Sequence, residues 1–225
     1  IVSKVFSLLI QQVPGIPQKP KGKSWKILDV GCGTGDTLEG LQELGWDTYG
    51  LEIDQQAIKL AKQRGLKKIR LGGYEKIADF PNKYFDCIRL YHVIEHLPNP
   101  RRCLQLIYQK LKPGGEVVLG TPNAGSMVSK IFGKYWYNLD IPRHLFVFSP
   151  ETLSSLVKKA GFSQVAASFC SGDGLGRSVI YTINELFKKK MDTNKFTLLF
   201  FILYPIEWIL DKLKTGDIMV VRGIR

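Results

Sequence analysis

The stretch ILDVGCGTGDTLEGL, residues 27–41, decides how this chain of 225 residues folds. A short apolar run at 26–30 leads into glycines at positions 31, 33 and 35, and an amphipathic pattern follows. Glycine adopts positive φ without strain and leaves the backbone bare, so that a ligand can lie against it. The stretch therefore predicts a tight turn between a strand and a helix, with a binding site at the turn.

An acidic residue follows this loop at the distance expected for a ribose contact. Glu52 lies 17 residues after Gly35, at the end of the next predicted strand, where a carboxylate can accept hydrogen bonds from both hydroxyls of a ribose. The G-x-G-x-G spacing differs from the G-x-G-x-x-G of dinucleotide-binding enzymes. Asp29, just before the loop, disfavours a pyrophosphate and favours an amino or sulfonium group. These residues predict a ribose-bearing cofactor.

Short apolar runs alternate with amphipathic stretches from Lys26 onward, which is typical of a parallel sheet covered by helices. Strands are predicted over 26–30, 47–53, 67–73, 85–93, 115–122, 162–170 and 217–225. Asp54 and Ser149 are placed to cap the helices that follow them. We predict an α/β fold with a seven-stranded, mostly parallel, Rossmann-like sheet flanked by helices, an N-terminal helix, and a helical insertion between the last two strands.

One domain is expected to cover residues 1–225. Its parts are an N-terminal helix and basic linker (1–25), a cofactor-binding core (26–170), a helical insertion (171–216) and the last strand (217–225).

Composition and charge narrow the function classes. The chain is 44% hydrophobic and 23% charged, as in an ordinary globular protein, which excludes disordered and disulfide-scaffold classes. Its net charge of +12 favours an anionic partner: nucleic acid, an anionic lipid surface or a phosphorylated substrate. The four cysteines form no C-x-x-C pair, so we expect reduced thiols in a cytoplasmic protein and no structural zinc.

Four motifs resemble, in their order along the chain, the class I S-adenosylmethionine-dependent methyltransferases. They are LDVGCGTG (28–35), GLEID (50–54), FDCIRLYHVIEHLPNP (85–100) and LKPGGEVVLGTPN (111–123). A further stretch, IPRHLFVFSPETLSSLVKKAGF (141–162), is similar to the subgroup that contains ubiquinone-biosynthesis O-methyltransferases and glycan-pathway methyltransferases. The resemblance runs from about Trp25 to Phe162 and implies an enzyme that uses S-adenosyl-L-methionine.

The resemblance also implies which residues contact the cofactor. It assigns Asp29, Gly31, Gly33 and Gly35 to the methionine part and Glu52 to the ribose, with Cys32, Ile53 and Tyr91 as further cofactor contacts. Family members often have Gly-Asp after the third strand, where the Asp contacts the adenine amino group. This chain has Gly73 and Tyr74 there, and Glu75 is expected to take the place of the Asp.

The three histidines follow predicted strands on the side where open α/β sheets bind ligands. We predict His144 as the general base on an acceptor hydroxyl, with His92 as the alternate, and Arg143 and His96 as substrate-binding residues. A structural role remains the alternative for each histidine.

The segment HVIEH (92–96) matches the zinc-protease pattern H-x-x-E-H, but it leaves a predicted strand for a loop with prolines, which disfavours that class. The ubiquinone-type enzymes have Glu-x-x-Glu-His here, which can bind a divalent cation. His92 replaces one of those carboxylates, which weakens the case for magnesium. No metal is assigned.

The most hydrophobic stretch is FTLLFFILYPIEWIL, residues 196–210, which lies near Lys188, Lys189, Lys190 and Lys195. It is too short before Glu207 to span a bilayer, but its basic flanks suit a helix that lies in a membrane surface. Packing in the core or in a homodimer interface is the alternative.

We therefore expect a methyltransferase that acts on an oxygen of a small-molecule, lipid-linked or glycan acceptor, with peripheral membrane contact through 188–210. An RNA methyltransferase and a non-catalytic binding protein are the alternatives. Nucleic acid is less favoured, because Tyr-His-Val follows the fourth strand in place of the Asn-Pro-Pro-Tyr of base amino-group methylation.

Overall fold

The computed structural model describes residues 15–17, 25–189, 191 and 197–225. The predicted N-terminal helix over 1–13 lies outside these residues. The seven strands are β1 (Lys26–Val30), β2 (Asp47–Glu52), β3 (Ile69–Leu71), β4 (Phe85–Tyr91), β5 (Leu111–Pro122), β6 (Ser163–Cys170) and β7 (Ile218–Ile224). All seven predicted strands are confirmed, although β3 is shorter than predicted and β5 begins earlier.

The α-helices are α2 (Asp36–Glu43), α3 (Gln55–Gln63), α4 (Pro100–Lys110), α5 (Met127–Phe132), α6 (Pro150–Lys159), α7 (Gly174–Phe187) and α8 (Thr197–Lys212). Short 3₁₀ helices are η1 (Tyr74–Asp79), η2 (Ile94–His96), η3 (Gly133–Tyr135) and η4 (Tyr137–Leu139). The predicted caps are confirmed: the Asp54 side chain accepts from the Gln56 N–H at 2.7 Å, and Ser149 forms a capping box with Thr152.

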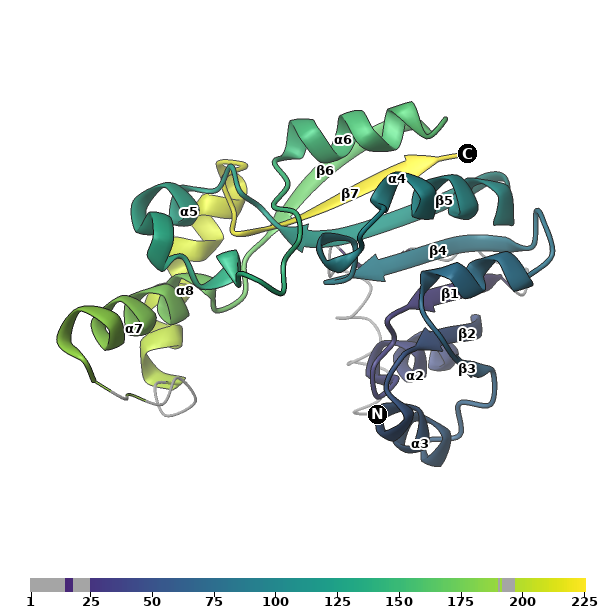
Figure 1. Ribbon diagram of the computed structural model, residues 1–225, viewed down its shortest axis with the longest axis horizontal. Helices are drawn as coiled ribbons and strands as arrows, with labels where there is room; N and C mark the ends of the chain where they lie inside the picture. Colours follow the sequence, from purple (N-terminus) through teal and green to yellow (C-terminus); the bar gives the residue numbers. More distant parts are fainter. Residues whose placement is uncertain (1–14, 18–24, 190, 192–196) are drawn as a thin grey trace.

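The sheet has the strand order β3-β2-β1-β4-β5-β7-β6. Every neighbouring pair is parallel except the two that include β7, which is antiparallel to both β5 and β6. The carboxyl ends of the other six strands therefore meet at one edge of the sheet. Helices α5, α7 and α8 lie beyond this edge in Figure 1. The predicted mostly parallel α/β sheet with a helical insertion is confirmed.

Two apolar layers cover the sheet because successive strand residues point to opposite faces. In β1, Leu28 and Val30 belong to the layer that includes α4 and α6, whereas Ile27 belongs to the layer that includes α2 and α3. All three are 2% exposed or less.

A buried ion pair replaces apolar contact on the α2–α3 side of the sheet. Both carboxylate oxygens of Asp29 in β1 accept from Nη1 of Arg89 in β4 at 2.9 Å, and Asp29 is 1% exposed. The Arg89 Nε donates to the Gly15 carbonyl at 3.0 Å. Arg89 therefore links the two central strands to the described segment at 15–17.

Arg89→Met is expected to lower the free energy of unfolding by about 3–5 kcal/mol, because it leaves the Asp29 carboxylate buried without its cation. The double variant with Asp29→Asn should recover part of this loss, because it removes the unpaired charge. Urea unfolding followed by circular dichroism measures both. Arg64→Met is the matched control: Arg64 pairs with Asp36 at the surface and should matter far less. An equal loss in Arg89→Met and Arg64→Met would contradict the role given to the buried pair.

Candidate active site

The turn after β1 is built so that only its middle glycine faces open space. Gly31, Gly33 and Gly35 have φ of 74°, 53° and 84°. A Cβ on Gly31 would lie 2.4 Å from Cγ2 of Val93, and one on Gly35 would lie 2.3 Å from Cδ1 of Leu66. A Cβ on Gly33 would meet nothing within 4 Å. Gly31 and Gly35 are thus required by packing, and Gly33 leaves room for a ligand against the backbone.

Glu52, at the carboxyl end of β2, is bonded to this turn. One of its oxygens, Oε2, accepts from the Gly33 N–H at 2.7 Å, and Oε1 accepts from the N–H groups of Ile53 and Asp54 at 2.8 and 3.0 Å. Three backbone N–H groups thus fix the side chain. It therefore holds a carboxylate beside the bare backbone of Gly33, as the sequence spacing predicts.

Two other predicted cofactor residues lie at the ends of β2 and β3. Ile53 is 75% exposed, an unusual position for a large apolar side chain next to a buried carboxylate. Glu75 is exposed, and its Oε2 would lie 2.7 Å from a Cβ on Gly73. Ile53 Cγ2 would lie 3.9 Å from the same point, so Ile53 and Glu75 border one surface. An apolar side chain and a carboxylate of this kind suit the face and the amino edge of a nucleobase.

Asp29 and Cys32 have their side chains packed beneath the sheet end of the turn, against Arg89 and Gly50. Asp29 gives both oxygens to Arg89, as described above. Cys32 lies against Gly50 of β2, where a Cβ would come 2.6 Å from its Sγ. Burial raises the pKa of the Cys32 thiol to about 12, and the charges of Asp29 and Glu52 add to this effect, so the thiol stays protonated near neutral pH. Direct contact of Asp29 and Cys32 with the cofactor stays a prediction.

A cavity of about 190 Å³ lies at the carboxyl ends of β4 and β6. Its polar lining includes Tyr91, His92, Asn138, Ser171 and Asp173. The Tyr91 ring packs over Gly120 of β5, where a Cβ would lie 2.2 Å from Cδ2 of the ring. Burial raises the pKa of Tyr91, so its hydroxyl stays protonated and serves as a hydrogen-bonding group.

His92 is the histidine that lines this cavity. Its backbone is left-handed, with φ of 55°, and its N–H donates to the Gly120 carbonyl at 2.9 Å. Its Nδ1 lies 3.3 Å from Oε1 of Glu95, which is 1% exposed. Because a carboxylate can only accept, this contact puts the proton on Nδ1 and leaves a lone pair on Nε2. The His92 side chain is 43% exposed and lines the cavity.

His144, the predicted base, is placed differently. Its side chain is 7% exposed, its Nδ1 lies 2.9 Å from the Asn138 carbonyl oxygen, and it is not among the residues that line the described cavity. Arg143 has a side chain that is 75% exposed and paired with Asp140. His96 has its Nδ1 2.8 Å from the Arg143 carbonyl oxygen. Substrate contact by Arg143 and His96 stays a prediction.

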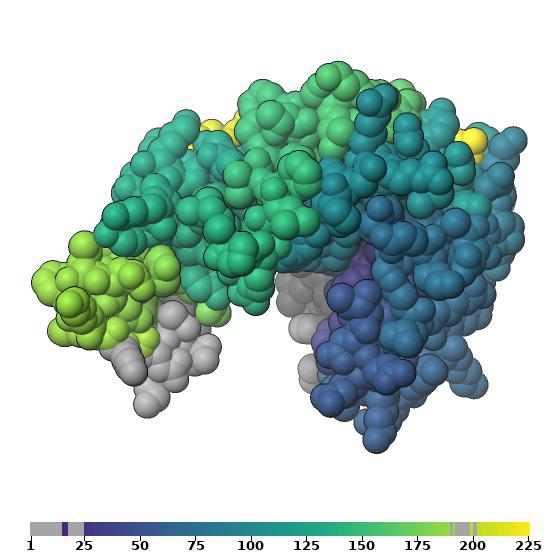
Figure 2. All heavy atoms as spheres, viewed as in Figure 1, coloured from purple at the N-terminus to yellow at the C-terminus, as the bar shows by residue number. Residues whose placement is uncertain are grey.

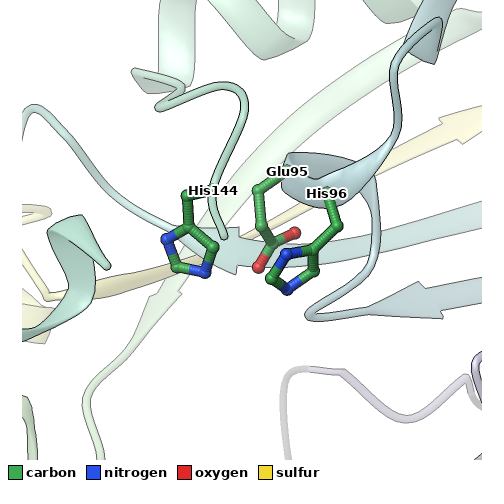
Figure 3. A group of neighbouring side chains, drawn as sticks. All are labelled: Glu95, His96 and His144. Carbon is green, nitrogen blue, oxygen red and sulfur yellow. The ribbon is translucent and has the colours of Figure 1, made fainter. Parts of the chain in front are cut away.

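Glu95, His96 and His144 form a cluster that has the donor set for a divalent cation (Figure 3). Their ligand atoms lie within 4.8 Å of one another. Each histidine directs its Nδ1 at a backbone carbonyl, which leaves Nε2 as the nitrogen that could ligate a metal, and Nε2 of His144 also lies 4.0 Å from Oδ2 of Asp140. The buried Oε2 of Glu95 has no hydrogen-bond partner among the described residues. Two imidazoles and one carboxylate suit zinc or a neighbouring transition metal better than magnesium. The absence of a metal stays a prediction.

Asn138 and Asp217 are site residues that sequence reasoning missed. Asp217 is fully buried and accepts from Trp136 Nε1 at 2.7 Å and from Asn138 Nδ2 at 2.5 Å. Burial raises the pKa of Asp217. Asn138 lines the cavity, and its hydrogen bond to Asp217 fixes its side chain. Asn138 lies in the short 3₁₀ helix η4 and Asp217 directly precedes β7, and no local pattern marks either one.

Residues 2–167 match the model of a family described as a methyltransferase domain. The chain belongs to this methyltransferase family. The match covers the glycine turn, Glu52 and His92, and it confirms the resemblance carried by the four sequence motifs.

Curated relatives and solved structures agree with this assignment. A ubiquinone biosynthesis O-methyltransferase from Idiomarina loihiensis is 33% identical over 103 residues, which are 44% of this chain and 42% of that protein. One from Azoarcus sp. is 30% identical over 155 residues, 64% of this chain and 66% of that protein. The alignments thus span about two thirds of these relatives or less.

A crystal structure of a SAM-dependent methyltransferase from Archaeoglobus fulgidus aligns with a TM-score of 0.64 and 26% identity, and covers 100% of this chain and 93% of that one. Phosphoethanolamine N-methyltransferase 2 from Haemonchus contortus, in complex with S-adenosyl-L-methionine, aligns with a TM-score of 0.61, 19% identity, and coverage of 98% and 52%, and shares the fold. The chain thus has the fold of S-adenosylmethionine-dependent methyltransferases.

The residues of this methyltransferase fit its cofactor. The bare backbone at Gly33 provides the space, Glu52 provides the carboxylate for a ribose, and exposed Ile53 provides an apolar surface for a base. These three residues and Glu75 would hold S-adenosyl-L-methionine.

Gly33→Ala is expected to weaken binding of S-adenosylhomocysteine by about tenfold or more, because the added methyl occupies the space of the ligand. Gly114→Ala is the matched control, since Gly114 also has positive φ (77°) and nothing close to its Cβ position. It lies near the amino end of β5, away from the glycine turn. Both variants should lose similar stability from backbone strain. Isothermal titration calorimetry separates the two effects. Undiminished affinity in Gly33→Ala would rule out this site.

Proposed function

We propose that the methyltransferase acts on a hydroxyl oxygen of a small-molecule, lipid-linked or glycan acceptor. The observation that carries the proposal is His92, which lines the cavity at the carboxyl ends of β4 and β6 with buried Glu95 behind it. A hydroxyl is a weak nucleophile at neutral pH and benefits from a base, which an amine acceptor needs less. The names of the curated relatives, which are ubiquinone biosynthesis O-methyltransferases, point the same way.

The protein residues divide the work between proton transfer and alignment. S-adenosyl-L-methionine, when bound, supplies a methyl group on a sulfonium sulfur. His92 accepts the acceptor's hydroxyl proton at Nε2. The Glu95 carboxylate receives the Nδ1–H of His92, keeps the ring in the required tautomer and stabilises the imidazolium that forms. Alignment of the hydroxyl is the other contribution, because a displacement of this type gains most from proximity.

The cavity favours the reacting end of an acceptor over a whole ligand. Its volume of about 190 Å³ is below the range of about 300–1,000 Å³ that is usual for sites that enclose a drug-sized molecule. Asn138 and Ser171 line it with hydrogen-bonding side chains, and Asp173 adds a carboxylate that is paired with Arg177. A hydroxyl-bearing head group fits this lining, with the rest of the acceptor outside.

An RNA methyltransferase is the second candidate, and the net charge of +12 is what favours it. Binding to phosphates would weaken steeply as the salt concentration rises. A protein that only binds the cofactor is the third, and it would label no acceptor at all.

His92→Asn is expected to lower kcat by about 10²–10⁴, because the base is lost, and to leave the affinity for S-adenosylhomocysteine unchanged. Asparagine suits the left-handed backbone of this position. His144→Asn is the comparison and should keep most of the turnover. Lipid, glycan and RNA fractions of the source cell, incubated with methyl-labelled cofactor, supply the acceptor.

Two results would contradict the proposal. Label found only in RNA would replace the acceptor class. Loss of turnover in His144→Asn with full activity in His92→Asn would move the base to His144.

A further inference from the structure

The helices of the insertion expose large apolar side chains at one end of the molecule. We define the α7–α8 surface by six of them, which are between 47% and 68% exposed: Leu186, Phe187, Ile202, Ile206, Ile209 and Leu213. On the side shown in Figure 2, α7 protrudes at the left, apart from the part of the molecule that carries α3. Exposed apolar side chains that gather on two adjoining helices mark an interaction surface.

The exposed stripe on α8 is distinct from the face by which this helix is held. Ile202, Ile206, Ile209 and Leu213 recur at intervals of four, three and four residues and therefore lie along one side of the helix. The helix is anchored through Glu207, which is 3% exposed and accepts from the Leu175 N–H of α7 at 3.0 Å. The stripe is thus not covered by the other described residues and can contact a surface outside the molecule.

Basic and aromatic side chains surround the stripe. Lys188 and Lys189 follow α7, Lys212 ends α8 and Lys214 follows it, and all four are exposed. Glu185 is the one exposed acidic residue in the described parts of 174–214. Trp208 is 54% exposed and has the Lys212 Nζ 5.4 Å from its ring centre. Aromatic and basic residues around an apolar face are typical of helices that lie in an anionic membrane surface.

Contact with a membrane would be through the surface of the bilayer. Among the helices of the described residues, none has the length and apolar character needed to cross a bilayer. The side chain of Phe200 and the residues Lys190 and Lys195 lie outside the described part, so the surface is defined without them.

We propose that the α7–α8 surface docks on an anionic membrane, with its apolar side chains in the headgroup region and its lysines on lipid phosphates. The lysine excess over one exposed acid is what commits the surface to an anionic bilayer, since a second copy of the chain would bring the same positive charge to the contact. The proposal goes beyond the methyl transfer. Docking would also bring the acceptor cavity near the membrane, because Asp173 and Gly174, where α7 begins, line that cavity.

Flotation of the full chain with vesicles tests the proposal. One set contains phosphatidylcholine alone and the other adds phosphatidylglycerol. The protein should float with the anionic vesicles only, and the bound fraction should fall as salt is raised. Two multiple variants should each reduce binding by about tenfold or more. The triple serine variant combines Ile202→Ser, Ile206→Ser and Ile209→Ser, and the charge variant combines Lys188→Glu and Lys189→Glu. Leu60→Ser and Lys59→Glu with Lys62→Glu, on exposed positions of α3, should leave binding unchanged.

The unfolding midpoint of each variant shows whether it is folded. Its affinity for S-adenosylhomocysteine shows whether the cofactor site is intact, so that a failure to dock is distinguished from a failure of the methyl-transfer site. Absence of binding to anionic vesicles, or equal binding to both vesicle types, would overturn the proposal. A dimer in sedimentation that is lost in the triple serine variant, without vesicle binding, would show that the surface joins two copies instead.

Discussion

The hydrogen bond from the Gly33 N–H to the Glu52 carboxylate, at 2.7 Å, is the interaction on which the site depends. It ties the turn after β1 to the end of β2, and the same carboxylate is held by the N–H groups of Ile53 and Asp54. The turn can take this shape because Gly31 and Gly35 have no Cβ that would collide with Val93 and Leu66. The sheet thereby presents a bare backbone and a fixed carboxylate at one point, which is what a ribose-bearing cofactor requires.

The parallel order of the strands brings the other parts of the site to this edge. β1 and β4 are neighbours, so the residues after β4 lie next to the glycine turn, and His92 and Glu95 are among them. The buried pair of Asp29 and Arg89 joins the same two strands, with Asp29 two residues before Gly31. α7 also begins at this edge, where Asp173 and Gly174 line the cavity, and its other end carries Leu186 and Phe187 of the α7–α8 surface.

Local signals explain why most of the fold and the cofactor side of the site could be predicted from the sequence. Strand and helix periodicity, the glycine turn, the position of Glu52 and the caps at Asp54 and Ser149 each depend on residues close together in the chain. The features that escaped prediction depend on distant partners. The pairing of both Asp29 oxygens with Arg89, 60 residues away, is one such feature.

The choice between the histidines shows the same limit. Sequence placed His92 and His144 in loops on one side of the sheet and favoured His144. The tertiary structure adds that Nδ1 of His144 lies against the Asn138 carbonyl and that the Glu95 carboxylate lies behind His92, and our proposal of His92 as the base depends on the second contact. Asn138 itself is fixed by Asp217, 79 residues later in the chain, and the single turn of η4 that carries it is too short to show a periodic pattern from which its position could be inferred.

A crystal structure of the protein with S-adenosylhomocysteine tests the central claim most directly. We expect the ribose beside the Glu52 carboxylate and the Gly33 backbone, the base against Ile53, and the sulfur directed at the cavity lined by Tyr91 and His92. Ligand density at any other place, or a sulfur that faces away from His92, would contradict the assignment of the cofactor site and of the base.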